Sequence, residues 1–268
     1  MNSEHGFWSP LHAPKIDWRR GTPFCVSAAD IYYSTENGLA ESQHVFLEGN
    51  DLPERWIHFP NQRPFVITEI GLGTGLNACL SIQRWLESRP MGGNLHYIGI
   101  ERSPLQQTDL VKALNQWPEL RNVSEELLFR WPDPIPGCHR RHFDDWGVTF
   151  DFWWGEAAEV LEDLASHRRA WVDAWYLDGF APARERGPWQ QSIYRLMAEL
   201  SHSNATASTF TVAGHVKKGL TEAGFSVKKT PGYGSKREIL EATLMSAAVS
   251  SPKLTPWDIN SKSTFFDK

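Results

Sequence analysis

A glycine-rich segment after a short apolar run is the first candidate ligand site. Residues 65–70 (FVITEI) are expected to form a buried strand. Three glycines in the spacing GxGxG follow it: Gly71, Gly73 and Gly75. Such glycines let the backbone approach a ligand, and the next helix offers free amides. The dinucleotide fingerprint would need a third glycine at Leu76, so the pattern favours S-adenosylmethionine, with Glu69, the glycines and Asn77 as contacts.

Two further acidic residues lie at or just after the carboxyl ends of expected strands, at the same edge of the sheet as the glycines. Glu101 closes the run HYIGIE, where a carboxylate can accept both hydroxyls of a ribose. It can equally act at the start of the helix expected after Pro104. Glu156 follows the expected strand 148–154 and is a candidate contact for the adenine amino group, or an ordinary acid in the first turn of a helix.

Asp178 is the strongest candidate for a catalytic group. It ends the strand expected at 174–177 and begins the sequence DGFAP. This sequence resembles the acidic-Pro-Pro-aromatic loop of amino methyltransferases that act on nucleobases and glutamine, with a glycine in place of the first proline. Methylation of an amine requires an acceptor for the N–H protons and in-line positioning, and a target on a nucleobase also needs a flat surface. We predict that Asp178 supplies the acceptor and Phe180 the surface. The alternative for Asp178 is an Asx turn, which leaves the nearby aromatic ring unexplained.

Strands and helices must alternate to bring these residues together. The strands are expected at 65–70, 95–100, 148–154, 174–177 and 205–212, with an antiparallel pair at 225–229 and 237–244. The intervening helices are expected at 77–87, 104–117, 156–165, 190–200 and 216–223. This order predicts a Rossmann-like α/β fold, a doubly wound and mostly parallel sheet closed by a terminal hairpin.

The same pattern divides the chain into three parts. Residues 1–60 form an N-terminal extension in which a short hairpin and turns are expected. Residues 61–246 form the catalytic domain, which would be of the S-adenosylmethionine-dependent methyltransferase type. Residues 247–268 read as a surface tail.

Composition limits the function classes. With 268 residues and a net charge of −5, the chain does not have the basic balance that unspecific nucleic-acid coating requires. It shows no apolar run long enough for a membrane span and no secretory leader, so we expect a cytoplasmic protein. The three cysteines show no metal-ligand spacing, and we expect no metal. His44 and the run His139–His142 are interpreted as loop residues.

Four segments give the chain a specific resemblance. They are ESQHVFLEGNDLPERW (41–56), EIGLGTGLN (69–77), VDAWYLDGFAPA (172–183), and the stretch 209–240 with TFTVAGHVKKGLTEAGF and GYGSKREIL. In these segments the chain resembles the bacterial tRNA 5-methylaminomethyl-2-thiouridine methyltransferases, which form the methyltransferase half of the bifunctional MnmC proteins. It departs from the family pattern at 184–189, where the family has Asn-Pro before Trp, and at Gly155-Glu156, where the usual pair is Gly-Asp.

The resemblance implies a particular reaction. The 5-aminomethyl group of a 2-thiouridine at the tRNA wobble position would be methylated to 5-methylaminomethyl, with S-adenosylmethionine as donor. Asp178 would take part in catalysis, and Gly71, Gly73 and Glu101 would surround the donor. The bifunctional relatives also carry a flavin-dependent oxidase. This chain has no second glycine fingerprint, so we expect no FAD, and separate upstream tRNA-modification enzymes would supply the aminomethyl substrate.

A proline and several basic and aromatic residues late in the chain are candidates for substrate and tRNA binding. They are Pro182, Arg184, Lys217, Lys218, Tyr233, Lys236 and Arg237. The cations would contact phosphates, and aromatic rings such as Tyr233 would stack on an unpaired anticodon base. The alternative for each cation is a solvated surface position beside an acid.

Other functions remain possible from the sequence. A methyltransferase for a small-molecule or protein amine would share the donor site without the RNA face. A non-catalytic RNA-binding module would have lost donor binding. A nicotinamide oxidoreductase is least favoured, because Leu76 interrupts the fingerprint.

Overall fold

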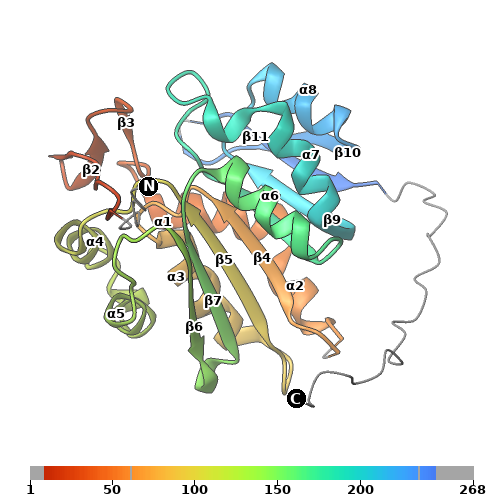
Figure 1. Cartoon of the computed structure of the whole chain (residues 1–268), viewed down its shortest axis with the longest axis horizontal. Coiled ribbons are helices and arrows are strands. Elements are labelled where there is room, and N and C mark those ends of the chain that lie inside the picture. The colour runs from red at the N-terminus through yellow and green to blue at the C-terminus, as the bar shows by residue number, and fades with distance from the viewer. Residues whose placement is uncertain (1–8, 61, 235, 246–268) are drawn as a thin grey trace, which may run out of the picture.

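An eight-stranded mixed sheet forms the centre of the computed structural model, which describes residues 9–60, 62–234 and 236–245 (Figure 1). Its strand order is β10-β11-β9-β8-β4-β5-β7-β6. The strands are β4 (Phe65–Ile70), β5 (Leu95–Glu101), β6 (Gly137–Phe143), β7 (Val148–Trp154), β8 (Val172–Leu177), β9 (Ser201–Thr209), β10 (Phe225–Pro231) and β11 (Glu238–Leu244). The neighbours from β9 through β8, β4 and β5 to β7 pair in parallel, whereas β6, β10 and β11 pair antiparallel. The predicted doubly wound sheet with a terminal hairpin is confirmed.

Helices cover both faces of this sheet (Figure 1). One face carries α2 (Leu52–Ile57), α3 (Leu76–Ser88), α4 (Gln107–Leu114) and α5 (Arg121–Phe129). The other carries α6 (Ala157–His167), α7 (Gln191–Leu200) and α8 (Gly214–Glu222). Short 3-10 turns lie at η3 (Pro118–Leu120), η4 (Asp144–Trp146) and η5 (Gly187–Trp189). The central strands are therefore buried on both sides, which explains their continuous apolar runs.

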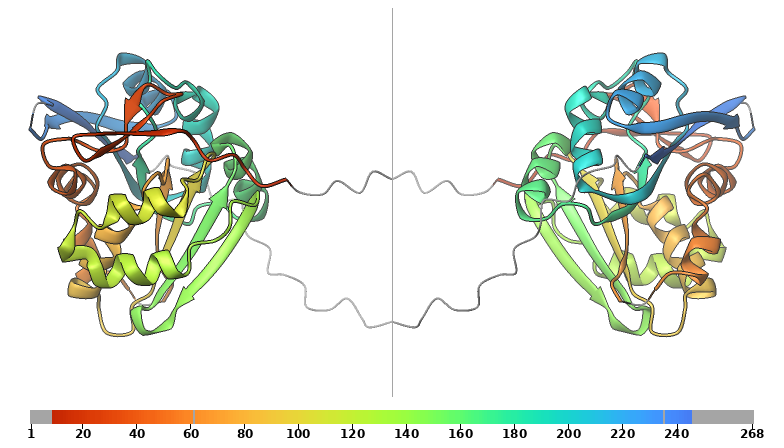
Figure 2. Two further views of the ribbon diagram at one scale, coloured as in Figure 1. Left: turned by 90° about the vertical axis from the view of Figure 1, so that its left-hand side faces the viewer. Right: turned by 90° about the vertical axis from the view of Figure 1, so that its right-hand side faces the viewer.

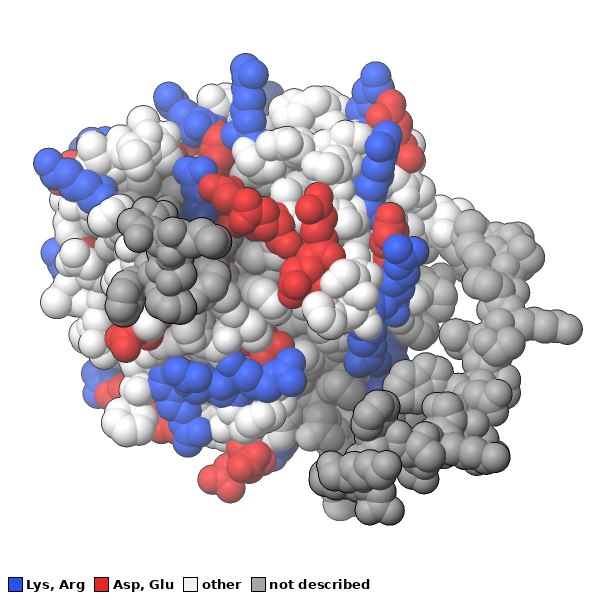
Figure 3. Space-filling model, in the orientation of Figure 1, with Lys and Arg blue, Asp and Glu red and all other residues white. Residues whose placement is uncertain are grey.

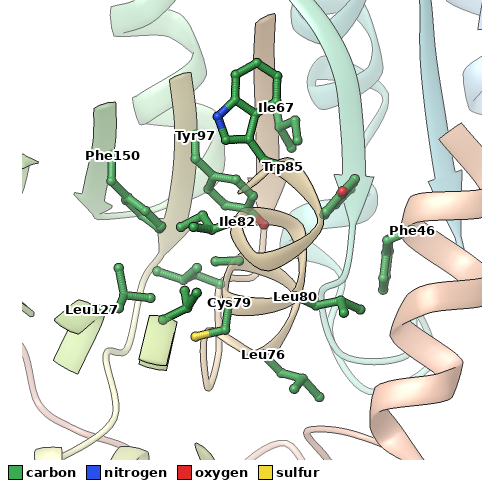
Figure 4. Packing of buried hydrophobic residues seen from close by; sticks show 14 of the residues in the cluster. Phe46, Ile67, Leu76, Cys79, Leu80, Ile82, Trp85, Tyr97, Leu127 and Phe150 are labelled. Atoms are coloured by element: carbon green, nitrogen blue, oxygen red, sulfur yellow. The ribbon is translucent and has the colours of Figure 1, made fainter. Parts of the chain in front are cut away.

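Helix α3 has the largest part in one of the two cores. Cys79, Ile82 and Trp85 are fully buried and pack against β5 and β7 through Tyr97 and Phe150 (Figure 4). The helix begins directly after Gly75, which has a left-handed backbone (φ +77°). This packing fixes the first turn of α3 at the carboxyl end of β4, where ligands bind in such sheets.

The N-terminal segment forms a second, small antiparallel sheet. Its strands are β1 (Ile16–Arg19), β2 (Thr22–Cys25) and β3 (Asp30–Ile31), and helix α1 (Gly38–Ser42), the π-helical turn η1 (Gln43–Leu47) and the 3-10 turn η2 (Glu48–Asn50) follow. Trp18 holds the sheet to α4, because its Nε1 donates to Asp109 Oδ1 at 2.9 Å and its ring lies 4.0 Å from Lys112 Nζ. Figure 2 shows this sheet at the same end of the molecule as the β10–β11 ribbon.

Two elements and the placement of three histidines differ from the sequence predictions. Helix α5 and strand β6 were not predicted, and the run His139–His142, interpreted as a loop, lies within β6. Side chains of β6 alternate between half-buried and exposed, and Arg140 binds Asp151 of β7 through two nitrogens at 2.7 Å. A charged edge strand of this kind shows little apolar periodicity. His44, also interpreted as a loop residue, lies in η1. The predicted tail 247–268 lies outside the described residues.

The described part of the chain contains no helix with the length and apolar character needed to cross a bilayer.

Candidate active site

A pocket with a cavity volume of about 290 Å³ opens at the carboxyl ends of β4, β5, β7 and β8. From β4 the chain continues to β5 and β7 on one side, whereas β8 pairs on the other side. Ligands in open α/β sheets bind at this reversal of strand order. The N-terminal segment contributes to the wall of the pocket, since Asp30, Tyr32 and Glu41 belong to the pocket lining.

The glycine loop forms the floor of the pocket at the end of β4. Gly71 and Leu72 both donate their amides to the Ile100 carbonyl, at 2.9 and 3.0 Å, which ties the loop to β5. Gly71 has φ +92°, and a Cβ there would lie 2.6 Å from the Asp178 carbonyl oxygen. Only glycine permits both this backbone conformation and the close approach of β8.

Glu101 lies beside this loop at the end of β5. Its Oε2 accepts from the Gly73 amide at 3.1 Å, and its Oε1 accepts from the Ser103 amide at 2.8 Å. Burial raises the pKa of Glu101, and these two hydrogen bonds oppose the increase. The carboxylate thus orders the glycine loop and also lines the pocket, as a ribose ligand would require.

Asp178 belongs to a buried network that starts beneath the pocket. Asn77 Nδ2 donates to Asp178 Oδ2 and to Glu69 Oε1, both at 2.7 Å, and Tyr97 donates to Glu69 Oε2 at 2.7 Å. Burial raises the pKa of Glu69 to about 8. Burial, followed by the charge of Glu69, raises the pKa of Asp178 well above its ordinary value. Asp178 therefore holds a proton more tightly than an ordinary aspartate does, and carboxyl groups perturbed in this way are common at functional sites.

Two aromatic residues, Phe180 and Tyr32, line the pocket beside the glycine loop. The rings of Phe180 and Tyr32 meet edge to face with centroids 5.1 Å apart. The Phe180 carbonyl accepts from Trp189 Nε1 at 2.8 Å, and the Ala181 amide donates to Asp30 Oδ2 at 3.0 Å. The DGFAP turn is thus held from both sides, by its own continuation and by the N-terminal sheet.

Carboxylates outnumber cations in the lining. Six acidic side chains line the pocket: Asp30, Glu41, Glu101, Glu156, Asp178 and Glu185. The two cations in the lining are already paired, Arg102 with Glu185 at 3.0 Å and Glu156 at 3.6 Å, and Lys236 with Glu41 at 2.6 Å. Such a pocket favours ligands with positive charge.

The structure brings together only part of the predicted site. The predicted residues that line the pocket are Gly71, Gly73, Asn77, Glu101, Glu156, Asp178, Phe180 and Lys236. The lining does not include Glu69, Gly75, Pro182, Arg184, Lys217, Lys218, Tyr233 and Arg237. Glu69 is fully buried behind Asn77, so its place is below the ligand site.

Sequence reasoning missed the N-terminal contribution. No role was predicted for Asp30, Tyr32 or Glu41, although Glu41 begins one of the four characteristic segments. Arg102 and Glu185 were also missed. In the part of the chain that is described, no group of three or more His, Cys, Asp or Glu side chains is arranged to hold a metal ion.

Comparison with known proteins connects this geometry to a family of enzymes. Residues 118–245 match the family described as S-adenosyl-L-methionine-dependent methyltransferase. A crystal structure of MnmC2 from Aquifex aeolicus has the same fold, with a TM-score of 0.68 at 18% identity over 88% of this chain and 72% of that one. This chain has the fold of an S-adenosyl-L-methionine-dependent methyltransferase. The fold prediction is confirmed.

The sequence matches are more specific. The bifunctional protein MnmC of tRNA 5-methylaminomethyl-2-thiouridine biosynthesis from Aeromonas salmonicida is 45% identical over 234 residues, covering 86% of this chain and 35% of that protein. The corresponding protein of Aeromonas hydrophila is 43% identical over 92% of this chain and 37% of its own length. The predicted resemblance to MnmC is confirmed. The methyltransferase-like chain spans about a third of the length of these curated relatives.

Proposed function

We propose that this chain transfers a methyl group from S-adenosyl-L-methionine to the 5-aminomethyl group of 2-thiouridine at the tRNA wobble position. The observation that carries the proposal is the position of Asp178, which lines the pocket and is held by Asn77 from the helix that follows the glycine loop. The MnmC proteins that this sequence resembles are named for biosynthesis of the methylated nucleoside. A tRNA substrate also implies a cytoplasmic location.

The pocket residues fit the donor. Gly71 lets the loop pack closely against the backbone of Asp178, Gly73 lies against the Tyr32 ring, and Glu101 offers carboxylate oxygens for ribose hydroxyls. Glu156 is our candidate for the adenine amino group, with 54% of its side chain exposed. When bound, the donor supplies a methyl group on a sulfonium sulfur, which passes to the amine nitrogen as the carbon–sulfur bond breaks, leaving S-adenosyl-L-homocysteine.

Asp178 prepares the amine for this transfer. An alkylamine resembling a lysine side chain has a pKa of roughly 10.4, so it enters mainly as the ammonium ion. Asn77 binds Asp178 Oδ2, which assigns Oδ1 to the amine. The positive charge of the ammonium ion favours the ionised form of Asp178, whose Oδ1 accepts one N–H proton, and the nitrogen lone pair becomes free to attack the methyl carbon. Phe180 provides a flat surface for the uracil ring.

The proposed domain bounds agree with a methyltransferase function. We propose residues 61–246 as the methyltransferase domain and residues 1–60 as an extension that completes the pocket, because Asp30, Tyr32 and Glu41 lie in its lining.

Among the predicted RNA contacts, Arg184, Lys217 and Arg237 are exposed and available to phosphates. Lys218 lies 3.6 Å from Glu222, and Figure 3 shows positive and negative side chains interspersed on the viewed face.

Nucleoside analysis tests the proposal. The purified chain is incubated with S-adenosyl-L-methionine and tRNA from cells that accumulate 5-aminomethyl-2-thiouridine, and the digested RNA is analysed by mass spectrometry. We expect one added methyl group on that nucleoside. If donor binding is measurable and no methyl group is added, the tRNA assignment is wrong.

A methyltransferase for a small-molecule or protein amine is the second candidate. The acidic lining favours it, because six carboxylates suit any cationic amine. Ribonuclease treatment of a cell extract used as substrate separates the two. Methyl transfer that survives this treatment would support the second candidate.

A further inference from the structure

An ammonium group is already bound inside the pocket, and it belongs to the chain itself. Lys236 Nζ lies 2.6 Å from Glu41 Oε1 and 4.3 Å from the centroid of the Phe210 ring. All three residues line the pocket that contains Asp178. One carboxylate and one aromatic face together make a recognised binding site for alkylammonium ions.

The elements that carry these groups differ in their freedom to move. Glu41 sits on helix α1, whose N-cap Asn37 accepts from the Ala40 amide at 3.0 Å. Lys236 lies in the turn between β10 and β11, and 40% of its side chain is exposed, compared with 12% for Glu41. The carboxylate is therefore largely enclosed by the protein, whereas the lysine side chain is partly open to solvent.

Removal of Lys236 alone would leave the nearly buried carboxylate of Glu41 without a partner, which is unfavourable in free energy. Replacing it with another ammonium ion keeps the charge balance. The proposed substrate carries this group, since both a lysine side chain and a protonated 5-aminomethyl group end in a methylene and an ammonium. Glu41, Lys236 and Asp178 all line the same pocket, so an ammonium ion bound at Glu41 shares that pocket with the carboxyl group that we propose as catalytic.

We propose that Glu41 and the Phe210 ring form the subsite that receives the substrate's ammonium group, and that Lys236 occupies this subsite until the substrate displaces it. The inference rests on the proposed function for the identity of the amine. Glu41 is then the residue that selects an amine over a neutral substituent, and the displaced Lys236 becomes available to RNA phosphates at the pocket mouth.

Binding of a free nucleoside tests this subsite without RNA. The chain saturated with S-adenosyl-L-homocysteine is titrated calorimetrically with 5-aminomethyluridine and, separately, with 5-hydroxymethyluridine. We expect the native chain to prefer the amine. Glu41→Gln should weaken amine binding by about tenfold and remove the preference, because one charge-assisted contact is lost. Glu48→Gln, an exposed carboxylate that pairs with His44, is the matched control.

The Lys236→Met variant distinguishes a ligand subsite from an ion pair that only stabilises the fold. If Lys236 competes with the substrate, its removal should tighten binding of 5-aminomethyluridine by several-fold, opposite in sign to Glu41→Gln. If the pair only fastens α1 to the β10–β11 turn, both variants should weaken binding alike. Such parallel losses, or equal affinity of native chain and Glu41→Gln, would overturn the subsite. Failure to methylate tRNA would instead count against the proposed function, since the nucleoside titration requires no tRNA.

Discussion

Strand β8 carries an aspartate near each end, and the two have opposite surroundings. Asp173, at the amino end, accepts from both terminal nitrogens of Arg63 at 2.7 Å and from the Val66 amide at 2.9 Å. Asp178, at the carboxyl end, is bound by the neutral amide of Asn77 and lies in the field of Glu69. The aspartate at the amino end is balanced by an arginine within the fold, whereas the aspartate at the carboxyl end has no cation bound to it among the described residues and lines the pocket.

The comparison explains why one strand can serve stability and chemistry together. A carboxylate that is paired with arginine gains little from a further cation, since its charge is already balanced. A carboxyl group whose pKa is raised by burial binds a proton more tightly than usual, and such groups are common at functional sites. Four predictions test this difference, from the largest expected effect to the smallest.

Asp178→Asn should lower kcat for methyl transfer by about 10²- to 10⁴-fold, the range expected for loss of a general base. The shape of the side chain is kept, so the melting temperature should change little. Single-turnover methylation with nucleoside detection measures the effect. A loss below about threefold would contradict the role of Asp178.

Asp173→Asn should lower the stability of the fold and not the rate of methyl transfer. It leaves the Arg63 guanidinium without its carboxylate, and breaking a buried pair of this kind costs roughly 3 kcal/mol. We expect denaturant titration to show that loss of stability, with kcat nearly unchanged in the folded fraction. Equal effects of the two aspartate variants on kcat would remove the distinction between the ends of β8.

Gly71→Ala should disturb the place where β4 and β8 meet beside the pocket. The added Cβ would approach the Asp178 carbonyl oxygen, and φ +92° is strained for alanine, so we expect about 2 kcal/mol of destabilisation and weaker S-adenosyl-L-homocysteine binding. Gly214→Ala is the control, because a Cβ there meets nothing within 4 Å. Unchanged ligand affinity in Gly71→Ala would show that the loop tolerates the side chain.

Glu69→Gln should change how stability depends on pH. The folded pKa of Glu69 is about 8, above the ordinary value of 4.5, so the folded chain holds a proton that the unfolded chain has lost between these values. The free energy of unfolding should therefore decrease as pH rises from about 5 to 8, by at most roughly 1.4 kcal/mol per pH unit. The variant should show a flatter profile in denaturant titrations. Parallel profiles would mean that Glu69 does not hold this proton.

The parts of the fold that follow strong periodicity could be predicted from sequence. Strand β4 matches its predicted range, and α3 extends the predicted helix by one residue at each end, because both are buried along whole faces. Strand β6 could not be recognised, since its exposed charges conceal the alternation and Arg140 is explained only by Asp151 across the sheet.

The candidate site likewise contains residues that the sequence could predict and residues that it could not. The glycine loop, Glu101 and Asp178 directly follow or end strands, so a sheet of parallel strands must bring them together. Tyr32 and Glu41 lie far from these strands in sequence, and no local pattern shows where the N-terminal segment packs. The Lys236–Glu41 contact joins residues from opposite ends of the chain, so only the tertiary structure reveals it.

A crystal structure with S-adenosyl-L-homocysteine tests the account most directly. We predict the ribose hydroxyls within hydrogen-bonding distance of Glu101, the adenine beside Glu156, and the sulfur on the side of the pocket that holds Asp178. A ligand bound away from Glu101, or with its sulfur far from Asp178, would contradict the assignment of the carboxyl end of the sheet as the active site.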